Sequence, residues 1–159
     1  MTQPTLHLFC GKMAAGKSTL AASIAADEGA VLVNEDNWNN LLWPGEIRTI
    51  EDYADRAGRL RKVLFPMLVE MLRSGMSVVL DFPGNTRRQR AGLISLSQAA
   101  GVGHVLHLIE TSDDECKRRL KIRNASGEHP FAPTEADFEL FSSYFELPSS
   151  DEGLMIIEH

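Results

Sequence analysis

The stretch that decides the fold is GKMAAGKS, residues 11–18, which matches the pattern G-x-x-x-x-G-K-[ST] at every position. An apolar run at 6–10 precedes it, and a segment with helical spacing at 17–27 follows it. A loop of this composition between a strand and a helix is typical of a phosphate-binding loop. The stretch therefore predicts a nucleoside triphosphate site after the first strand.

The residue types in this loop fit the chemistry of phosphate binding. Backbone N–H groups and the helix N-terminus are expected to surround the phosphates. Lys17 is expected to bridge the β- and γ-phosphates, and the Ser18 hydroxyl to ligate Mg²⁺. Gly11 and Gly16 permit backbone conformations and close approaches that a Cβ would block. The predicted ligands are ATP and Mg²⁺, and the predicted nucleotide-binding residues are Gly11, Met13, Ala14, Ala15, Gly16, Lys17, Ser18 and Thr19.

Apolar runs alternate with stretches of helical spacing along the rest of the chain. This alternation predicts βαβ crossovers and a mainly parallel sheet. We expect one three-layer α/β domain over residues 1–159, with a polar loop at 124–133 acting as a lid. The expected strands are 6–10, 30–33, 76–80, 105–109 and 154–157, and the expected helices are 17–27, 50–73, 86–100, 112–123 and 134–145.

Composition narrows the classes of partner. The chain has 16 Lys and Arg against 22 Asp and Glu, a formal net charge of −6. Non-specific nucleic-acid binding usually requires a basic face, so this balance argues against it. No apolar run approaches the roughly 20 residues that span a bilayer, so we expect no membrane partner and a cytoplasmic location. Cys10 and Cys116 are far apart, which favours buried thiols over a zinc site or a disulfide.

Carboxylates follow two of the expected strands. Apolar residues 31–33 lead into Asn34, Glu35 and Asp36, and residues 78–80 lead into Asp81. The carboxyl ends of parallel strands meet at one edge of the sheet, beside the phosphate loop. Asp36 is predicted to be the base that accepts the proton of a hydroxyl, with a helix cap as the alternative. Glu35 competes for that role, and strand alternation is expected to turn it away. Asp81 is predicted to hold the Mg²⁺ shell.

Basic residues gather before the expected lid. Arg119 and Arg123 are four positions apart on one helix and so share a face. Mobile positive charge over the phosphates stabilises phosphoryl transfer, and a closing loop excludes water. The predicted catalytic residues are therefore Lys17, Asp36, Arg119 and Arg123, although a solvated basic face is an alternative for the arginines. For a further set the choice between binding a substrate anion and lying in solvent stays open: Arg56, Arg59, Arg61, Arg87, Arg88 and Arg90.

Taken together, the loop at 11–18, Asn34-Glu35-Asp36, Leu80-Asp81 and Arg123-Asn124 resemble the small P-loop kinases grouped with polynucleotide kinase, chloramphenicol phosphotransferase and zeta toxin. The resemblance implies a P-loop NTPase fold, with helices on both faces of a five-stranded sheet in the order 2-3-1-4-5. It also implies that Asp36 is the base and that lid arginines contact phosphate. Polynucleotide kinase relatives often carry a further lid arginine where this chain has residues 127–129, and Arg119 is the candidate replacement.

The function expected from the sequence is transfer of the γ-phosphoryl group of ATP to a hydroxyl of a small molecule. Two alternatives remain at this point. One is a kinase acting on 5′-hydroxyl ends of nucleic acid, which the acidic composition disfavours. The other is an ATP-binding switch or ATPase with no phosphoryl acceptor.

Overall fold

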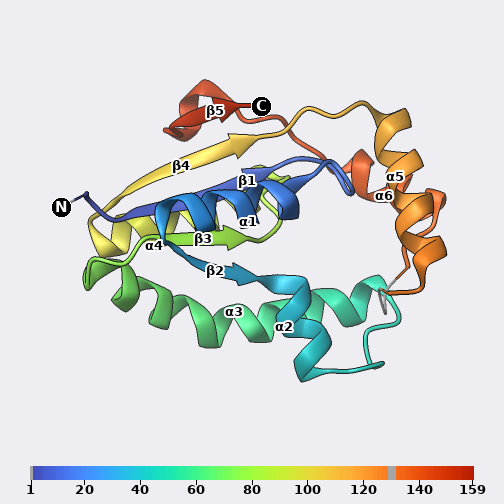
Figure 1. The fold of residues 1–159 in the computed structure, drawn as a ribbon, viewed down its shortest axis with the longest axis horizontal. Helices are drawn as coiled ribbons and strands as arrows, with labels where there is room; N and C mark the ends of the chain where they lie inside the picture. Colours follow the sequence, from blue (N-terminus) through green and yellow to red (C-terminus); the bar gives the residue numbers. More distant parts are fainter. Residues whose placement is uncertain (1, 129–131) are drawn as a thin grey trace.

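The computed structural model describes residues 2–128 and 132–159. Its centre is a five-stranded sheet in the order β2-β3-β1-β4-β5, in which every neighbouring pair is parallel (Figure 1). The predicted α/β fold class and strand order are confirmed. The strands are β1 (Thr5–Cys10), β2 (Val31–Asn34), β3 (Val78–Asp81), β4 (Gly103–Leu108) and β5 (Ile156–Glu158).

Helices cover both faces of the sheet. On one face, Leu6 and Leu8 of β1 pack with leucines of α3 and α4, whereas Phe9 packs on α1 from the other face. This alternation along one strand produces the three layers. Figure 1 shows α5 and α6 beyond the carboxyl ends of the strands. The helices are α1 (Lys17–Glu28), α2 (Glu35–Leu42), α3 (Ile50–Arg73), α4 (Arg87–Ala100), α5 (Asp113–Ser126) and α6 (Glu135–Ser143), with a short 3₁₀ turn at Ser150–Glu152.

Helix α2 was not among the expected helices, although the alternative role of Asp36 as a helix cap implied a helix at this place. The side-chain oxygen of Asn34 accepts a hydrogen bond from the Asn37 N–H at 2.7 Å, and so caps a helix that begins at Glu35. Glu35 and Asp36 then lie in its first turn, where carboxylates are favoured by the helix dipole. The cap is therefore Asn34, and the alternative that assigned this role to Asp36 is wrong.

The expected lid begins later than predicted. Helix α5 continues to Ser126 and ends where Gly127 adopts a left-handed conformation with φ 68°. Residues 124–126 are thus helical, and the loop that was predicted to act as a lid starts at Gly127. The part of the expected lid at 129–131 lies outside the described residues.

Two smaller expectations concern thiols and membranes. Cys10 and Cys116 are both buried and free, as predicted. Over the described ranges 2–128 and 132–159, no helix has the length and apolarity needed to cross a bilayer.

Candidate active site

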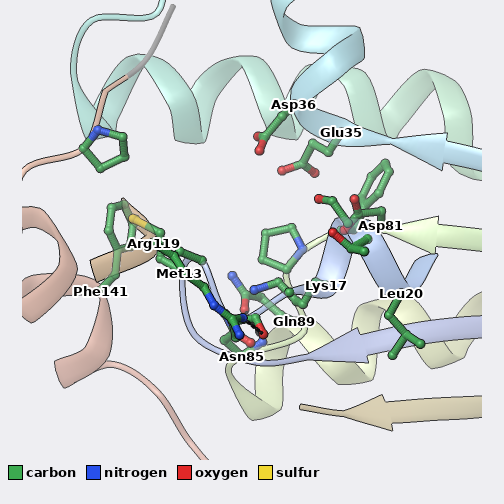
Figure 2. Close-up of a pocket in the computed structure, with 18 of the residues that line it drawn as sticks. Met13, Lys17, Leu20, Glu35, Asp36, Asp81, Asn85, Gln89, Arg119 and Phe141 are labelled. Carbon is green, nitrogen blue, oxygen red and sulfur yellow. Dashed lines mark hydrogen bonds between the residues drawn. The ribbon is translucent and has the colours of Figure 1, made fainter. Parts of the chain in front are cut away.

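A cavity of about 1030 Å³ opens at the carboxyl ends of β1, β2 and β3. Its walls come from the phosphate loop, the starts of α1 and α2, the β3–α4 connection, and helices α3, α5 and α6. Figure 2 shows Lys17, Glu35, Asp36, Asp81 and Arg119 around this cavity. The sequence-predicted residues that line it are Met13, Ala14, Ala15, Gly16, Lys17, Ser18, Thr19, Asp36, Asp81, Arg119 and Arg123.

The loop at 11–18 has the backbone shape of an anion cradle. Ala14 and Gly16 both have positive φ, 61° and 110°, and the Ala15 N–H closes a turn onto the Lys12 carbonyl at 3.0 Å. Gly11 is buried behind the cavity, and a Cβ there would lie 3.1 Å from the Ile109 carbonyl oxygen. Gly16 is therefore needed for its backbone conformation and Gly11 for close approach.

The Lys17 ammonium is held by the loop itself. Its Nζ donates to the carbonyl oxygens of Gly11 and, at 3.1 Å, of Lys12. Burial lowers the pKa of Lys17, and the nearby carboxylates of Asp81 and Asp36 act against that shift. These contacts hold a buried positive charge within the loop, close enough to Asp81 and Asp36 to interact with both carboxylates.

Asp81 lies at the end of β3 and is 8% exposed. Its carboxylate accepts a hydrogen bond from the side-chain amide nitrogen of Asn34 at 2.5 Å. The Asn34 side chain therefore has two roles, because its oxygen caps α2 and its nitrogen orients Asp81. The Ser18 hydroxyl and the Asp81 carboxylate lie on the same cavity. Mg²⁺ is usually bound by one or two protein oxygens together with substrate phosphates. The Ser18 hydroxyl and the Asp81 carboxylate fit an ion that is bound in this way. Within the described residues, no group of three His, Cys, Asp or Glu side chains forms a metal site made by the protein alone.

Glu35 and Asp36 both line the cavity, in different surroundings. Glu35 is 1% exposed and accepts hydrogen bonds from Tyr53 Oη at 2.5 Å and Arg61 Nε at 2.9 Å. Burial raises the pKa of Glu35, and the Arg61 charge opposes that rise. Asp36 is exposed to the cavity side. The expectation that strand alternation turns Glu35 away is wrong, because both residues lie in the first turn of α2.

The two predicted lid arginines approach the cavity from α5. Arg119 donates from Nε to Glu115 at 2.9 Å and from Nη1 to the Ala15 carbonyl at 3.2 Å, which places its guanidinium beside the phosphate loop. The Arg123 Nε is buried and has no hydrogen-bond partner within the described part of the chain. A buried guanidinium nitrogen of this kind calls for an acceptor such as a phosphate oxygen.

Arg87 and Arg90 have structural partners instead of facing the cavity. Arg87 pairs with Asp151 at 2.8 Å on the surface. Arg90 is 1% exposed and pairs with Glu152 at 2.8 Å, and it also donates to the backbone carbonyls of Gly84 and Glu146. Arg90 thus fits neither of the alternatives left open by the sequence, because it is a buried arginine that fastens the segment after α6 to α4.

The sequence reasoning missed several residues of the cavity wall. The Asn85 side-chain oxygen accepts a hydrogen bond from the Gly11 N–H at 2.9 Å. The Asn85 backbone carbonyl accepts a hydrogen bond from the Glu146 N–H at 2.8 Å. It joins the phosphate loop to the segment after α6. The Pro83-Gly84-Asn85 turn directly after an apolar strand was the available signal. The other residues with polar or aromatic side chains that line the cavity and were not named from the sequence are Ser23, Tyr53, Phe82, Thr86, Gln89, Phe141 and Tyr144.

Known proteins share the fold that surrounds this cavity. A family profile described as AAA domain matches residues 6–148. The chain belongs to this AAA domain family. No curated protein matches the sequence. Among solved structures, a candidate kinase from Chloroflexus aurantiacus resembles this AAA domain with a TM-score of 0.77 at 21% identity, over 100% of this chain and 86% of the other.

Two further structures with the fold of this AAA domain are named as kinases of small molecules. The APS kinase of Mycobacterium tuberculosis, solved with AMPPNP and APS, has a TM-score of 0.63 at 20% identity, over 99% of this chain and 90% of the other. A gluconokinase from Sinorhizobium meliloti has a TM-score of 0.56 at 18% identity, over 98% and 81%. The resemblance to P-loop kinases is therefore confirmed in the fold of this chain.

Proposed function

We propose that this protein binds ATP with Mg²⁺ and transfers the γ-phosphoryl group to a hydroxyl of a small molecule. The observation that carries the proposal is the meeting of five side chains on one cavity: Lys17, Asp36, Asp81, Arg119 and Arg123. An anion cradle, a carboxylate able to accept a proton, and mobile cations are the parts that phosphoryl transfer needs.

The phosphate loop would hold the β- and γ-phosphates through its backbone N–H groups. Lys17, now bonded to loop carbonyls, would turn its ammonium to the phosphate oxygens. Arg119 and Arg123 would contact the same phosphates from α5, and the segment 124–133 would act as a lid within one domain. Bound Mg²⁺, held by Ser18 and the Asp81 shell, would neutralise charge on the phosphate oxygens.

Transfer proceeds by in-line displacement. The acceptor oxygen forms a bond to the γ-phosphorus while the bond from that phosphorus to the β–γ bridging oxygen breaks, and its electron pair leaves with ADP. The acceptor proton passes to a carboxylate. We assign this role to Asp36, because its side chain is exposed on the cavity wall, whereas Glu35 is buried and is positioned by hydrogen bonds from Tyr53 and Arg61.

The size of the cavity supports a kinase over a switch or ATPase without an acceptor. The cavity volume of about 1030 Å³ lies at the upper end of the roughly 300–1,000 Å³ that small-molecule sites span. A cavity of this size has room for an acceptor beside the triphosphate. The deciding experiment incubates the protein with Mg²⁺ and γ-labelled ATP in the presence of sugars, amino alcohols, nucleosides and 5′-hydroxyl oligonucleotides. Label on a small alcohol supports the proposal, whereas label only on oligonucleotides or only in free phosphate contradicts it.

A further inference from the structure

Helix α2 carries the proposed base, Asp36, but few apolar contacts hold its first turn in place. The helix has eight residues, and the two that are buried, Glu35 and Asn39, are both polar. Leu41 and Leu42 near its end are 74% and 50% exposed. A helix of this length is unstable in water on its own. The position of the turn that carries Asp36 therefore depends largely on polar contacts.

Glu35 makes such contacts with α3. Its Oε1 accepts a hydrogen bond from Tyr53 Oη at 2.5 Å, and its Oε2 lies 2.9 Å from both Nε and Nη2 of Arg61. Hydrogen bonds that involve charged groups are stronger than those between neutral groups. Asn39, one turn further along α2, has no hydrogen-bond partner for either amide atom within the described residues. Of the two buried side chains of α2, Glu35 is thus the one that ties the helix to α3.

Arg61 extends this connection to the end of β3. Its guanidinium lies over the ring of the buried Phe82, 5.6 Å from the centroid. The preceding residues are joined as well, because the Asn34 side chain donates to Asp81 at 2.5 Å. The residues where α2 begins are therefore connected, directly or through Arg61, to the residues where β3 ends.

We propose, resting on the kinase function above, that Glu35 is a positioning residue. Held by Tyr53 and Arg61, it fixes the first turn of α2 so that the Asp36 carboxylate faces the acceptor hydroxyl. Figure 2 shows Glu35 and Asp36 together where α2 begins. Neighbouring residues of one helical turn move together, and a misplacement of about 1 Å at a reacting group can cost about 100-fold in rate.

Arg61 allows positioning to be separated from direct binding of a substrate. Glu35 and Tyr53 line the cavity, whereas Arg61 does not. Loss of Arg61 therefore removes no contact with a bound substrate and acts only through Glu35 and Phe82. The part of α3 that packs in the core consists of other residues, the leucines 60, 64, 68 and 72.

The first test is hydrogen exchange followed by mass spectrometry on the full-length protein, which requires neither an acceptor nor turnover. Glu35→Gln and Arg61→Met should each speed the exchange of α2 amides by about tenfold or more, and leave β1 and β3 unchanged. Arg59→Met is the matched control, because the Arg59 side chain is 65% exposed and pairs with Asp55 at 3.0 Å on the same helix. Unchanged α2 exchange in the two site variants, or an equal change in the control, would overturn the proposal.

The second test measures label transfer from ATP to an alcohol that accepts label in the screen above. Glu35→Gln and Arg61→Met should lower kcat about tenfold or more, while KM for the alcohol and Kd for ATP stay within about threefold of wild type. The double variant should lose no more than the larger single loss, because residues that act as a unit give non-additive effects. Losses that multiply, or a raised KM with kcat unchanged, would overturn the proposal.

Stability separates positioning from general support of the fold. Arg61→Met leaves Glu35 buried without its charged partner and should lower the urea midpoint, whereas the double variant removes both charges and should regain most of it. The kcat should stay low in the double variant, and recovery of kcat together with the midpoint would overturn the proposal. If Arg61→Met does not fold, Arg61→Lys takes its place, since it keeps the charge but loses the two-nitrogen contact. A wild type that labels no alcohol refutes the kinase function, and the exchange result still decides whether Glu35 holds α2.

Discussion

Gly84 is the position where fold and site are most tightly joined, and Gly84→Ala should damage both. A Cβ built on Gly84 would lie 2.4 Å from the Phe9 carbonyl oxygen of β1 and 3.7 Å from Cγ of the buried Arg90. The nearest atom belongs to the backbone of a central strand, which cannot rotate away as a flexible side chain would. The connection from β3 to α4 must therefore shift outward.

Overpacking of this kind typically costs about 1–3 kcal/mol, and we expect Gly84→Ala to fall at or above the upper end because backbone must move. For a chain of this length, each 1 kcal/mol lowers Tm by about 2–4 °C. The displacement should also weaken ATP binding, because Asn85 follows Gly84 and holds the Gly11 N–H of the phosphate loop at 2.9 Å.

Gly92→Ala is the matched control. Gly92 lies within α4, and a Cβ there meets nothing within 4 Å. Alanine is favoured over glycine in a helix interior by about 0.5–1 kcal/mol, so this change should be neutral or stabilising. Urea unfolding with two spectroscopic probes measures both variants, and titration with ATP and Mg²⁺ measures the site. The reasoning is refuted if Gly84→Ala unfolds at the same urea concentration as the wild type, or if both glycines respond alike.

Three further predictions concern a buried ion pair, the base and a buried histidine. Arg90→Leu should lower the free energy of unfolding by about 3–5 kcal/mol, because Glu152 is left buried and unpaired. Arg87→Leu, which breaks the exposed pair with Asp151, should cost about 1 kcal/mol or less by the same urea assay; similar losses would show that burial is not the cause. Asp36→Asn should abolish label transfer while the Kd for ATP stays within about threefold of wild type, and loss of both together would make Asp36 structural. Burial, with help from His7 and His159, lowers the pKa of His107 from 6.5 to about 4 in the folded protein. The stability tied to a neutral His107 is therefore complete above pH 6.5 and is lost as the pH falls toward 4. In His107→Gln, the urea midpoint should change less between pH 6.5 and pH 4 than it does in the wild type. A pH dependence equal to that of the wild type would contradict this assignment.

The parts of the fold that follow from local patterns were predictable. The apolar runs of β1 and β3 are buried on both faces, and such continuous runs flanked by helical spacing specify a parallel sheet with crossovers. The phosphate loop was predictable for a different reason. Its backbone geometry requires glycines and its ligand requires a positive charge, and both requirements are met within the one short segment 11–18.

Features that depend on contacts between distant segments were not predictable. Helix α2 depends on the Asn34 side chain, which both caps the helix and bonds to Asp81, a residue 47 positions away. Arg90 resembles a surface residue in the sequence, and its burial depends on Glu152, 62 positions further along the chain. The position of Glu35 was missed for a related reason, because the change from strand to helix at Asn34 resets which side chains face the cavity.

The central claim is that the loop at 11–18 binds the triphosphate and that the Lys17 charge contributes to binding. Calorimetric titration with ATP and Mg²⁺ tests it most directly, using the wild type, Lys17→Ala and, as a control in the same loop, Lys12→Ala, whose side chain pairs with Asp113. The account predicts that Lys17→Ala weakens ATP binding by more than about tenfold, or 1.4 kcal/mol, and that Lys12→Ala stays within about threefold of wild type. Equal losses in the two variants, or ATP binding unaffected by Lys17→Ala, would contradict it.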